Sequence, residues 1–305
     1  MTPGVLVLAG PTAVGKSSLA MDVAEAIGGE IVSADSRQLY RGMDIGTAKP
    51  SREDRARVPH HLLDVLDPGT RITAGHWLEL ARARIEALAS RDKSAVVVGG
   101  STLYVHALVS GLADLPPVPA TLERQLMAQA TEAGGADRLF DELQAADPEA
   151  ARTLDPTKTQ RLVRWVGVLR TTRRRPSELW AESQRPGVPS KLVVLDRPRE
   201  ELYARIDGRV DQMLDDGLVD EIVRLGEDPA SLPTLRATIG YQEWLPVLTG
   251  ERTPEEAVRL IKRNSRRYAK RQLTWYRRYP DALWLDAQTA SVDSLLDACG
   301  GVRRP

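Results

Sequence analysis

The stretch VLVLAGPTAVGKS at residues 5–17 decides the fold of this chain. Five apolar residues end abruptly at Gly10, and residues 10–17 fit the pattern G-x-x-x-x-G-K-[ST]. The inner face of the helix that we expect next consists of Leu19, Ala20, Val23, Ala24 and Ile27. A strand, a glycine loop and a helix in this order predict a phosphate-binding loop, in which backbone N–H groups and Lys16 surround phosphate oxygens and the Ser17 hydroxyl reaches a magnesium ion. The alternative, a tight turn before a surface helix, accounts less well for the motif and its flanks together.

Length and composition predict a globular chain in a reducing compartment. The 305 residues suffice for two ordinary domains or for one domain with a large insertion, and 42% of them are hydrophobic. The single cysteine, Cys299, excludes a disulfide within the chain, and no C-x-x-C motif or Cys/His cluster can hold zinc. We therefore expect a cytoplasmic setting. The first residues lead directly into the apolar strand, so we expect no signal peptide, and no run of about 18 apolar residues predicts a membrane span.

The formal net charge is zero, but the basic residues are clustered. Residues 259–278 contain nine Lys or Arg and no acid, and residues 161–175 contain six Arg and no acid. Such stripes can bind nucleic-acid phosphates even on a neutral chain. The alternative is a solvated helix face in an arginine-rich protein, since 35 of the 42 basic residues are Arg.

Strand and helix patterns alternate at both ends of the chain. Before residue 110 we predict strands at 30–33, 61–65 and 95–98, a helix at 73–89 and a polar irregular segment at 37–59. After residue 188 we predict strands at 191–195 and 282–285 and helices at 199–225 and 254–279. This alternation is typical of a doubly wound parallel sheet.

The intervening segment has a different pattern. A stiff connection, LPPVP at residues 115–119, leads into helical periodicities from residue 121 to residue 182. These periodicities are broken at Gly134-Gly135, Pro148, Pro156 and Pro176. We therefore predict an α/β fold, a P-loop-containing parallel sheet flanked by helices, with an all-helical inserted domain. The core comprises residues 1–112 and 189–305, and the insertion comprises residues 113–188.

Two loops are expected beside the phosphate-binding loop, because ligands lie at the carboxyl ends of parallel strands. Asp35 follows one strand and can act as a general base, hold magnesium through water, or cap a short helix. Ser101 follows Gly99 and Gly100, so its hydroxyl can point at a bound group or cap the next helix.

Other polar residues leave more alternatives open. Arg205 and Arg209 lie four residues apart on a late helix and can fold over a pyrophosphate, although neighbouring acids favour an exposed, salt-bridged face. The adjacent His60 and His61 suit a loop contact or core packing better than a shared metal.

Several blocks together strongly resemble the bacterial tRNA dimethylallyltransferases, also called tRNA isopentenyltransferases. The blocks are GPTAVGKS (10–17), VSADSRQLY (32–40), MDIGTAKP (43–50), PHHLLD (59–64), VVGGSTLY (97–104), TQRLVR (159–164) and KRQLTWYR (270–277). They cover nearly the whole chain in order, and most of them are far more restrictive than the loop motif alone.

The resemblance implies transfer of a dimethylallyl group from dimethylallyl diphosphate to the exocyclic amine of adenosine 37 of tRNA, next to the anticodon, in tRNAs that read codons beginning with U. The leaving group is pyrophosphate, so the loop has a role without a nucleotide. Magnesium, Lys16 and Arg209 would stabilise the departing oxygen. By match to the family's motifs, Asp35 is the base and Ser101 replaces a Thr or Ser that contacts the reacting groups.

The resemblance also implies the remaining site residues. The diphosphate would be bound by Gly10, Pro11, Thr12, Ala13, Val14, Gly15, Lys16, Ser17 and Arg209. The tRNA would be bound by Asp35, Ser36, Arg37, Gln38, Ser101, Arg124, Gln160, Arg161 and Arg164. Arg37 stands where the family usually has a small or apolar residue, and Arg124 is carried over from a register that gives either Glu123 or Arg124.

Alternative functions use the same loop. A small-molecule or nucleotide kinase would bind ATP there, and Asp196 at the end of a strand is placed like a magnesium-binding Asp. A non-enzymatic RNA-binding protein would use the loop only to sense a ligand. For the transferase we expect Mg²⁺ as the cofactor, the tRNA anticodon stem-loop and dimethylallyl diphosphate as partners, no membrane contact and a monomer.

Overall fold

The structure, a computed structural model, describes residues 4–155, 157–226 and 228–298. The chain divides into two compact units. The core unit runs to Ser110 and resumes at Val188, and the inserted unit is Gly111–Gly187. Cys299 and Pro156 lie outside the described residues. None of the described helices is long and apolar enough to cross a membrane.

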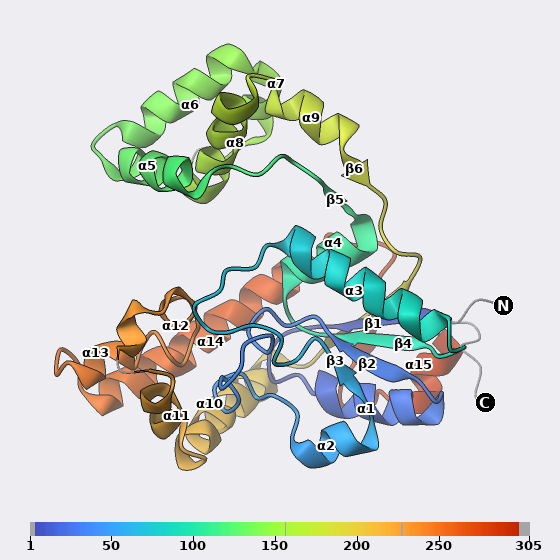
Figure 1. The fold of residues 1–305 in the computed structure, drawn as a ribbon. Coiled ribbons are helices and arrows are strands. Elements are labelled where there is room, and N and C mark those ends of the chain that lie inside the picture. The colour runs from blue at the N-terminus through green and yellow to red at the C-terminus, as the bar shows by residue number, and fades with distance from the viewer. Residues whose placement is uncertain (1–3, 156, 227, 299–305) are drawn as a thin grey trace. The chain divides into compact units, whose positions relative to one another are not determined.

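The core unit contains a six-stranded sheet in the order β3-β2-β4-β1-β7-β8, and every neighbouring pair is parallel (Figure 1). Its strands are β1 (Val5–Ala9), β2 (Glu30–Ser33), β3 (His60–His61), β4 (Ala95–Val98), β7 (Lys191–Asp196) and β8 (Leu283–Asp286). Residues 5–9 and 30–33 are buried throughout, as expected for strands covered on both faces. The predicted parallel α/β core is confirmed.

Helices cover both faces of this sheet, with α3 and α4 on one side and α1 on the other (Figure 1). They are α1 (Lys16–Ala26), α2 (Arg52–Arg57), α3 (Ala74–Ala89), α4 (Thr102–Ser110), α10 (Arg199–Asp215), α11 (Leu218–Arg224), α12 (Pro233–Arg236), α13 (Leu245–Leu248), α14 (Pro254–Tyr276) and α15 (Val292–Ala298). A 3₁₀ turn spans Pro229–Ser231. On the first side, the fully buried Trp77 stacks on Tyr104 and donates a hydrogen bond to Ser33 O.

The inserted unit is helical apart from one pair of two-residue strands, which lie near its first and last residues. Its helices are α5 (Ala120–Thr131), α6 (Gly135–Ala146), α7 (Pro148–Thr153), α8 (Thr159–Thr172) and α9 (Pro176–Glu182). The antiparallel strands β5 (Leu112–Ala113) and β6 (Gln184–Arg185) close the unit. A separate apolar cluster centred on Leu126, Leu139 and Leu162 gives this unit its own core.

Three predicted elements differ from the structure. The helix expected at 199–225 is interrupted at Gly217, whose φ is +94°, so it forms α10 and α11. The segment 37–59 contains α2, which a capping box of Ser51 and Asp54 initiates. The strand expected at 61–65 is wrong beyond His61, because Leu62 and Asp64 adopt positive φ values.

Candidate active site

The predicted loops of the core unit follow β1, β2 and β4, which are direct neighbours in the sheet. Ser101 N donates to Ala34 O at 3.2 Å, so the loop after β4 lies against the residue that precedes Asp35. The strand order therefore brings the phosphate-binding loop, Asp35 and Ser101 to one edge.

The phosphate-binding loop, residues 10–17, requires glycine where it leaves β1. Gly10 has a φ of +145°, and a Cβ there would lie 2.6 Å from Leu195 O on β7. Lys16 Nζ donates to Gly10 O at 3.0 Å and to Pro11 O at 2.7 Å. The loop thus folds around the ammonium group and gives it oxygen partners.

Two arginines of α10 reach this loop from the far end of the sequence. Arg205 Nε donates to Ala13 O at 2.9 Å, and Arg209 Nη1 lies 3.4 Å from Thr12 Oγ1. The acids two residues further along, Asp207 and Asp211, pair with α14 instead. Among the described residues neither arginine pairs with an acid, so the expected salt-bridged face is not formed, although Arg205 is exposed as expected.

Charge is concentrated in this loop region. Burial, together with the nearby Arg209 charge, lowers the pKa of Lys16 to about 7, although Asp35 opposes the shift. Burial also lowers the pKa of Arg209, again opposed by Asp35, but a guanidinium stays charged. Two cations therefore share the neighbourhood of one carboxylate, an arrangement that favours an added anion.

The loop after β2 is an Asx turn rather than a helix cap. Asp35 Oδ1 accepts the Arg37 N–H at 2.8 Å, and Arg37 Nη2 donates to Ala237 O at 3.0 Å. Residues 36–39 form turns, so the alternative of Asp35 as the N-cap of a short helix is not observed. The Gln38 side chain forms hydrogen bonds within the protein: it accepts from Ser33 Oγ and donates to the carbonyls of residues 47 and 48.

A cavity of about 330 Å³ joins these groups. Its polar part includes Thr12, Ala13, Asp35, Ser36, Arg37 and Arg209. Its apolar part includes Ile206, Val210, Met213, Ile239 and Ile261. Two residues of the phosphate-binding loop, a carboxylate and an apolar wall thus face one space, whereas Lys16 does not line it. Ser101 borders this edge through its backbone, but it does not line the cavity.

Ser17 faces a second cavity, of about 290 Å³, together with Ser18, Asp22 and Ser33. These are oxygen donors, the type that Mg²⁺ prefers. The described residues include no cluster of three His, Cys, Asp or Glu that could hold a metal. The Ser17 hydroxyl and the Asp22 carboxylate are thus oxygen ligands of the kind that Mg²⁺ takes.

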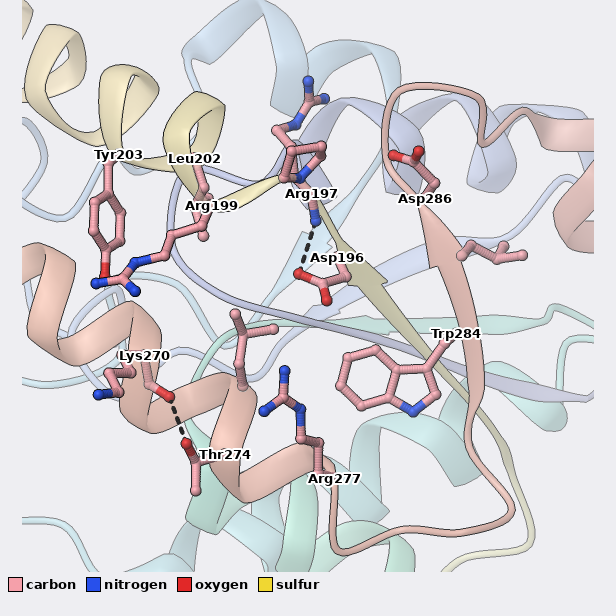
Figure 2. Close-up of a pocket in the computed structure, with 13 residues that line it drawn as sticks. Asp196, Arg197, Arg199, Leu202, Tyr203, Lys270, Thr274, Arg277, Trp284 and Asp286 are labelled. Carbon is pink, nitrogen blue, oxygen red and sulfur yellow. Dashed lines mark hydrogen bonds between the residues drawn. The ribbon is translucent and has the colours of Figure 1, made fainter.

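A third cavity lies elsewhere and contains none of the predicted site residues. It measures about 620 Å³ and opens at the ends of β7 and β8, between α10 and α14 (Figure 2). Asp196, the strand-end acid of the kinase alternative, lies here and accepts a hydrogen bond from Arg197 N.

Sequence reasoning missed residues that hold the site together from α11 and α14. Buried Glu221 accepts hydrogen bonds from the backbone N–H groups of residues 44, 45 and 46 and from Tyr241. Gln272 bonds to Thr12 N and to Gly100 O. Gln272 lies on the buried face of α14, at a position in the helical repeat where an apolar residue is expected. A polar residue at such a position was the sequence signal that could have identified it.

The tRNA residues predicted on the inserted unit belong to two packed helices. Arg124 lies on α5 and is exposed, with its Nε bonded to Ala120 O. Gln160 and Arg161 are exposed at the start of α8. Arg164 is half-buried and donates to Leu115 O at 3.1 Å, so part of its donor capacity fixes the connection into this unit.

The basic helix α14 is partly neutralised. Lys262 and Arg266 pair with Asp211 and Asp207 on α10. Arg267 and Lys270, by contrast, have no carboxylate partner among the described residues. Arg271 lies over the Tyr268 ring at 5.7 Å and lines the 330 Å³ cavity. The basic residues of α14 thus include structural cations, Lys262 and Arg266, which pair with α10, and available cations, Arg267 and Lys270.

Known proteins resemble this chain over nearly its whole length. The sequence pattern of the IPP transferase family matches residues 38–279. A tRNA dimethylallyltransferase from Salinibacter ruber is 44% identical over 301 residues, which cover 96% of this chain and 91% of that protein.

Two crystal structures share the fold. The tRNA isopentenylpyrophosphate transferase of Bacillus halodurans has a TM-score of 0.70 and 34% identity, covering 97% of this chain and 94% of that one. A eukaryotic dimethylallyltransferase acting on tRNA has a TM-score of 0.79 and 28% identity, covering 98% of this chain and 77% of that one.

The lowered pKa of Lys16 predicts that pyrophosphate binding depends on pH. A bound diphosphate stabilises the charged ammonium, so binding takes up a proton at pH values above the ligand-free pKa of about 7. We expect the affinity measured by calorimetry to fall between about pH 7 and pH 9, by at most about tenfold per pH unit. Lys16→Arg stays charged and is the control, because it retains only the pH dependence of pyrophosphate itself. Equal slopes in the two proteins would contradict the assignment.

Proposed function

This chain belongs to the IPP transferase family, and from that premise we propose that it transfers a dimethylallyl group from dimethylallyl diphosphate to a tRNA adenosine. The acceptor is the exocyclic amine of the adenosine next to the anticodon, at tRNA position 37. The products are isopentenyladenosine and diphosphate. Its relatives carry the names of transferases that act on tRNA, so the family favours this activity over the kinase alternative.

One observation carries the proposal for the site: Asp35, Arg209 and the first part of the phosphate-binding loop, Thr12 and Ala13, line the same cavity. Transfer requires groups that bind the diphosphate on one side of the reacting carbon. On the other side it requires a group that accepts the proton of the attacking amine. A nucleotide kinase needs such a cradle for phosphates but not an apolar wall beside it. Ile206, Val210 and Met213 supply such a wall and suit a five-carbon prenyl group.

The residues of the loop region would stabilise the leaving group. Negative charge grows on the diphosphate oxygen as its bond to the allylic carbon breaks. Lys16 would exchange its two carbonyl partners for phosphate oxygens, and Arg209 would approach from α10. A Mg²⁺ ion held by Ser17 would neutralise further diphosphate charge. The remaining backbone N–H groups of residues 13–17 would complete the cradle.

Asp35 would act as the base for the acceptor amine. The lone pair of this amine is delocalised into the adenine ring, so it gains nucleophilicity only as its proton is drawn away. The Asx turn uses Asp35 Oδ1, and it fixes the direction in which the carboxylate points. Ser101 would contact the reacting groups from the neighbouring loop.

The adenosine would leave the anticodon loop to reach Asp35. Bases in a single-stranded loop can be extruded for about a few kcal/mol. Arg37, which the bond to Ala237 O holds, would lie beside the target base. Arg124, Gln160, Arg161 and Arg164 of the inserted unit would contact tRNA. We further propose that the protein acts as a cytoplasmic monomer.

The test of the activity is a comparison of donors. The protein is incubated with unmodified tRNA and either labelled dimethylallyl diphosphate or labelled ATP, and the nucleosides are analysed by mass spectrometry. We expect isopentenyladenosine from the prenyl donor and no label from ATP. Label entering RNA only from ATP would indicate a kinase, and turnover with neither donor would indicate a binding protein.

Asp35→Asn tests the base. The amide keeps an oxygen for the Arg37 N–H, so the Asx turn survives, but it cannot accept the proton. We expect the single-turnover rate to fall about 10²- to 10⁴-fold while the tRNA dissociation constant changes little. Turnover close to that of the unaltered protein would remove Asp35 from this role.

The available cations of α14 should contribute to RNA affinity. Each phosphate contact that is lost reduces the slope of log affinity against log salt by about 0.7–0.9. We expect Arg267→Gln with Lys270→Gln to lower that slope. The matched control, Lys262→Gln with Arg266→Gln, removes the same charge from residues that already pair with α10. A larger effect of the control pair would contradict the division of the stripe.

A further inference from the structure

Gln272 is a buried polar residue to which neither the family resemblance nor the proposed chemistry gives a role. It lies on α14, far in sequence from the loops of the first hundred residues, and its exposed fraction is 1%. Burying an amide is costly unless both of its ends are hydrogen-bonded. Both ends of Gln272 are, and its two partners belong to two different loops of the active site.

The contacts of Gln272 use both functions of the amide. Oε1 accepts the Thr12 N–H at 3.0 Å, and Nε2 donates to Gly100 O at 2.7 Å. Among uncharged side chains, an amide offers an acceptor and a donor on one rigid plane. Gln272 therefore sets the spacing between the phosphate-binding loop and the loop that carries Ser101.

Position 100 is adapted to this contact. A Cβ on Gly100 would lie 2.4 Å from Gln272 Nε2, so a side chain there would displace the amide. Tyr268, one turn earlier on α14, also places its hydroxyl 3.4 Å from Gly100 O. One face of α14 thus fixes the carbonyl that immediately precedes Ser101.

The contact also divides the phosphate-binding loop into two parts. The Thr12 N–H is hydrogen-bonded to Gln272, and the Thr12 hydroxyl contacts Arg209. The first part of the loop is therefore an anchor to α14 and α10. The N–H groups that remain for a diphosphate belong to the second part, residues 13–17.

We propose that Gln272 is a positioning residue that holds the diphosphate loop and the Ser101 loop in register for transfer, an inference that rests on the proposed function. The amide touches neither substrate and acts through Thr12 and Gly100. It also lies on the helix that carries the available cations Arg267 and Lys270. The helix proposed to contact RNA thereby fixes the donor site from its inner face.

The test compares variants in steady-state transfer and in pyrophosphate binding. Gln272→Met keeps the length and removes both hydrogen bonds, and Gln272→Glu keeps an acceptor for Thr12 but loses the donor to Gly100. We expect kcat to fall about 10- to 100-fold, because displacement of reacting groups by about 1 Å costs rates of this order. The KM for tRNA should change less than about threefold, since the cations that bind RNA are retained. Pyrophosphate affinity should weaken about fivefold, as expected for one loosened hydrogen-bonded loop.

A double-mutant cycle distinguishes positioning from a general loss of structure. If Gln272 acts through the Ser101 loop, its substitution costs less kcat in a Ser101→Ala background than in the unaltered protein. Thr274→Val is the matched control, because this exposed residue of α14 bonds only to its own helix at Lys270 O. We expect its kcat to stay within twofold of the unaltered protein.

The outcomes separate this inference from the proposed function. No transfer by the unaltered protein rejects the function, and then an unchanged pyrophosphate affinity in Gln272→Met rejects the positioning role as well. Transfer by a folded Gln272→Met variant within twofold of the unaltered kcat overturns the inference alone. Independent, multiplicative losses with Ser101→Ala overturn it too. If Gln272→Met fails to fold, the same readouts on Gln272→Glu decide.

Discussion

The order of three strands is the constraint on which the site depends. β2, β4 and β1 lie side by side, and each ends in a loop that carries one part of the chemistry. Parallel strands bring these loops to one edge, but they do not set the distances between them. The packing of loop backbone on backbone sets those distances, at Gly10 against Leu195 O and at Ser101 N against Ala34 O. The sheet places the groups, and close backbone contacts at Gly10 and Gly99, where a Cβ would clash, let the loops pack tightly.

The electrostatics of the site follow from this crowding. Lys16 and Arg209 are both drawn into a region with one carboxylate, and burial disfavours the charge on each. Lys16 is satisfied by two carbonyl oxygens of its own loop. A diphosphate offers stronger partners than these carbonyls and relieves the mutual repulsion of the two cations. The charges around the loop therefore favour an anion.

The local sequence was sufficient to predict those elements whose structure is determined by their own residues. The run at residues 5–9 and the motif that follows predicted β1, the loop and α1, and the apolar runs at 30–33 and 95–98 predicted β2 and β4. Asp35 was selected as a candidate because the end of a parallel strand is a known ligand position.

Residues whose role depends on distant partners could not be assigned in this way. Arg205 contacts Ala13, which is 192 positions earlier, and Gln272 contacts Thr12 across 260 positions. The spacing of Arg205 and Arg209 fits a solvated face and a lid equally well, and only the direction in which α10 packs decides between them.

The direction in which α10 packs has a visible cause. Asp207 and Asp211 lie two residues beyond the arginines, about 200° away around a helix. The acids pair with Arg266 and Lys262 of α14, so the arginines must face the phosphate-binding loop. Partly exposed pairs of this kind contribute only about 0–1 kcal/mol each to stability, so their effect here is to orient α10. Part of the basic stripe on α14 therefore serves the diphosphate site indirectly, by turning the cations of a neighbouring helix toward it.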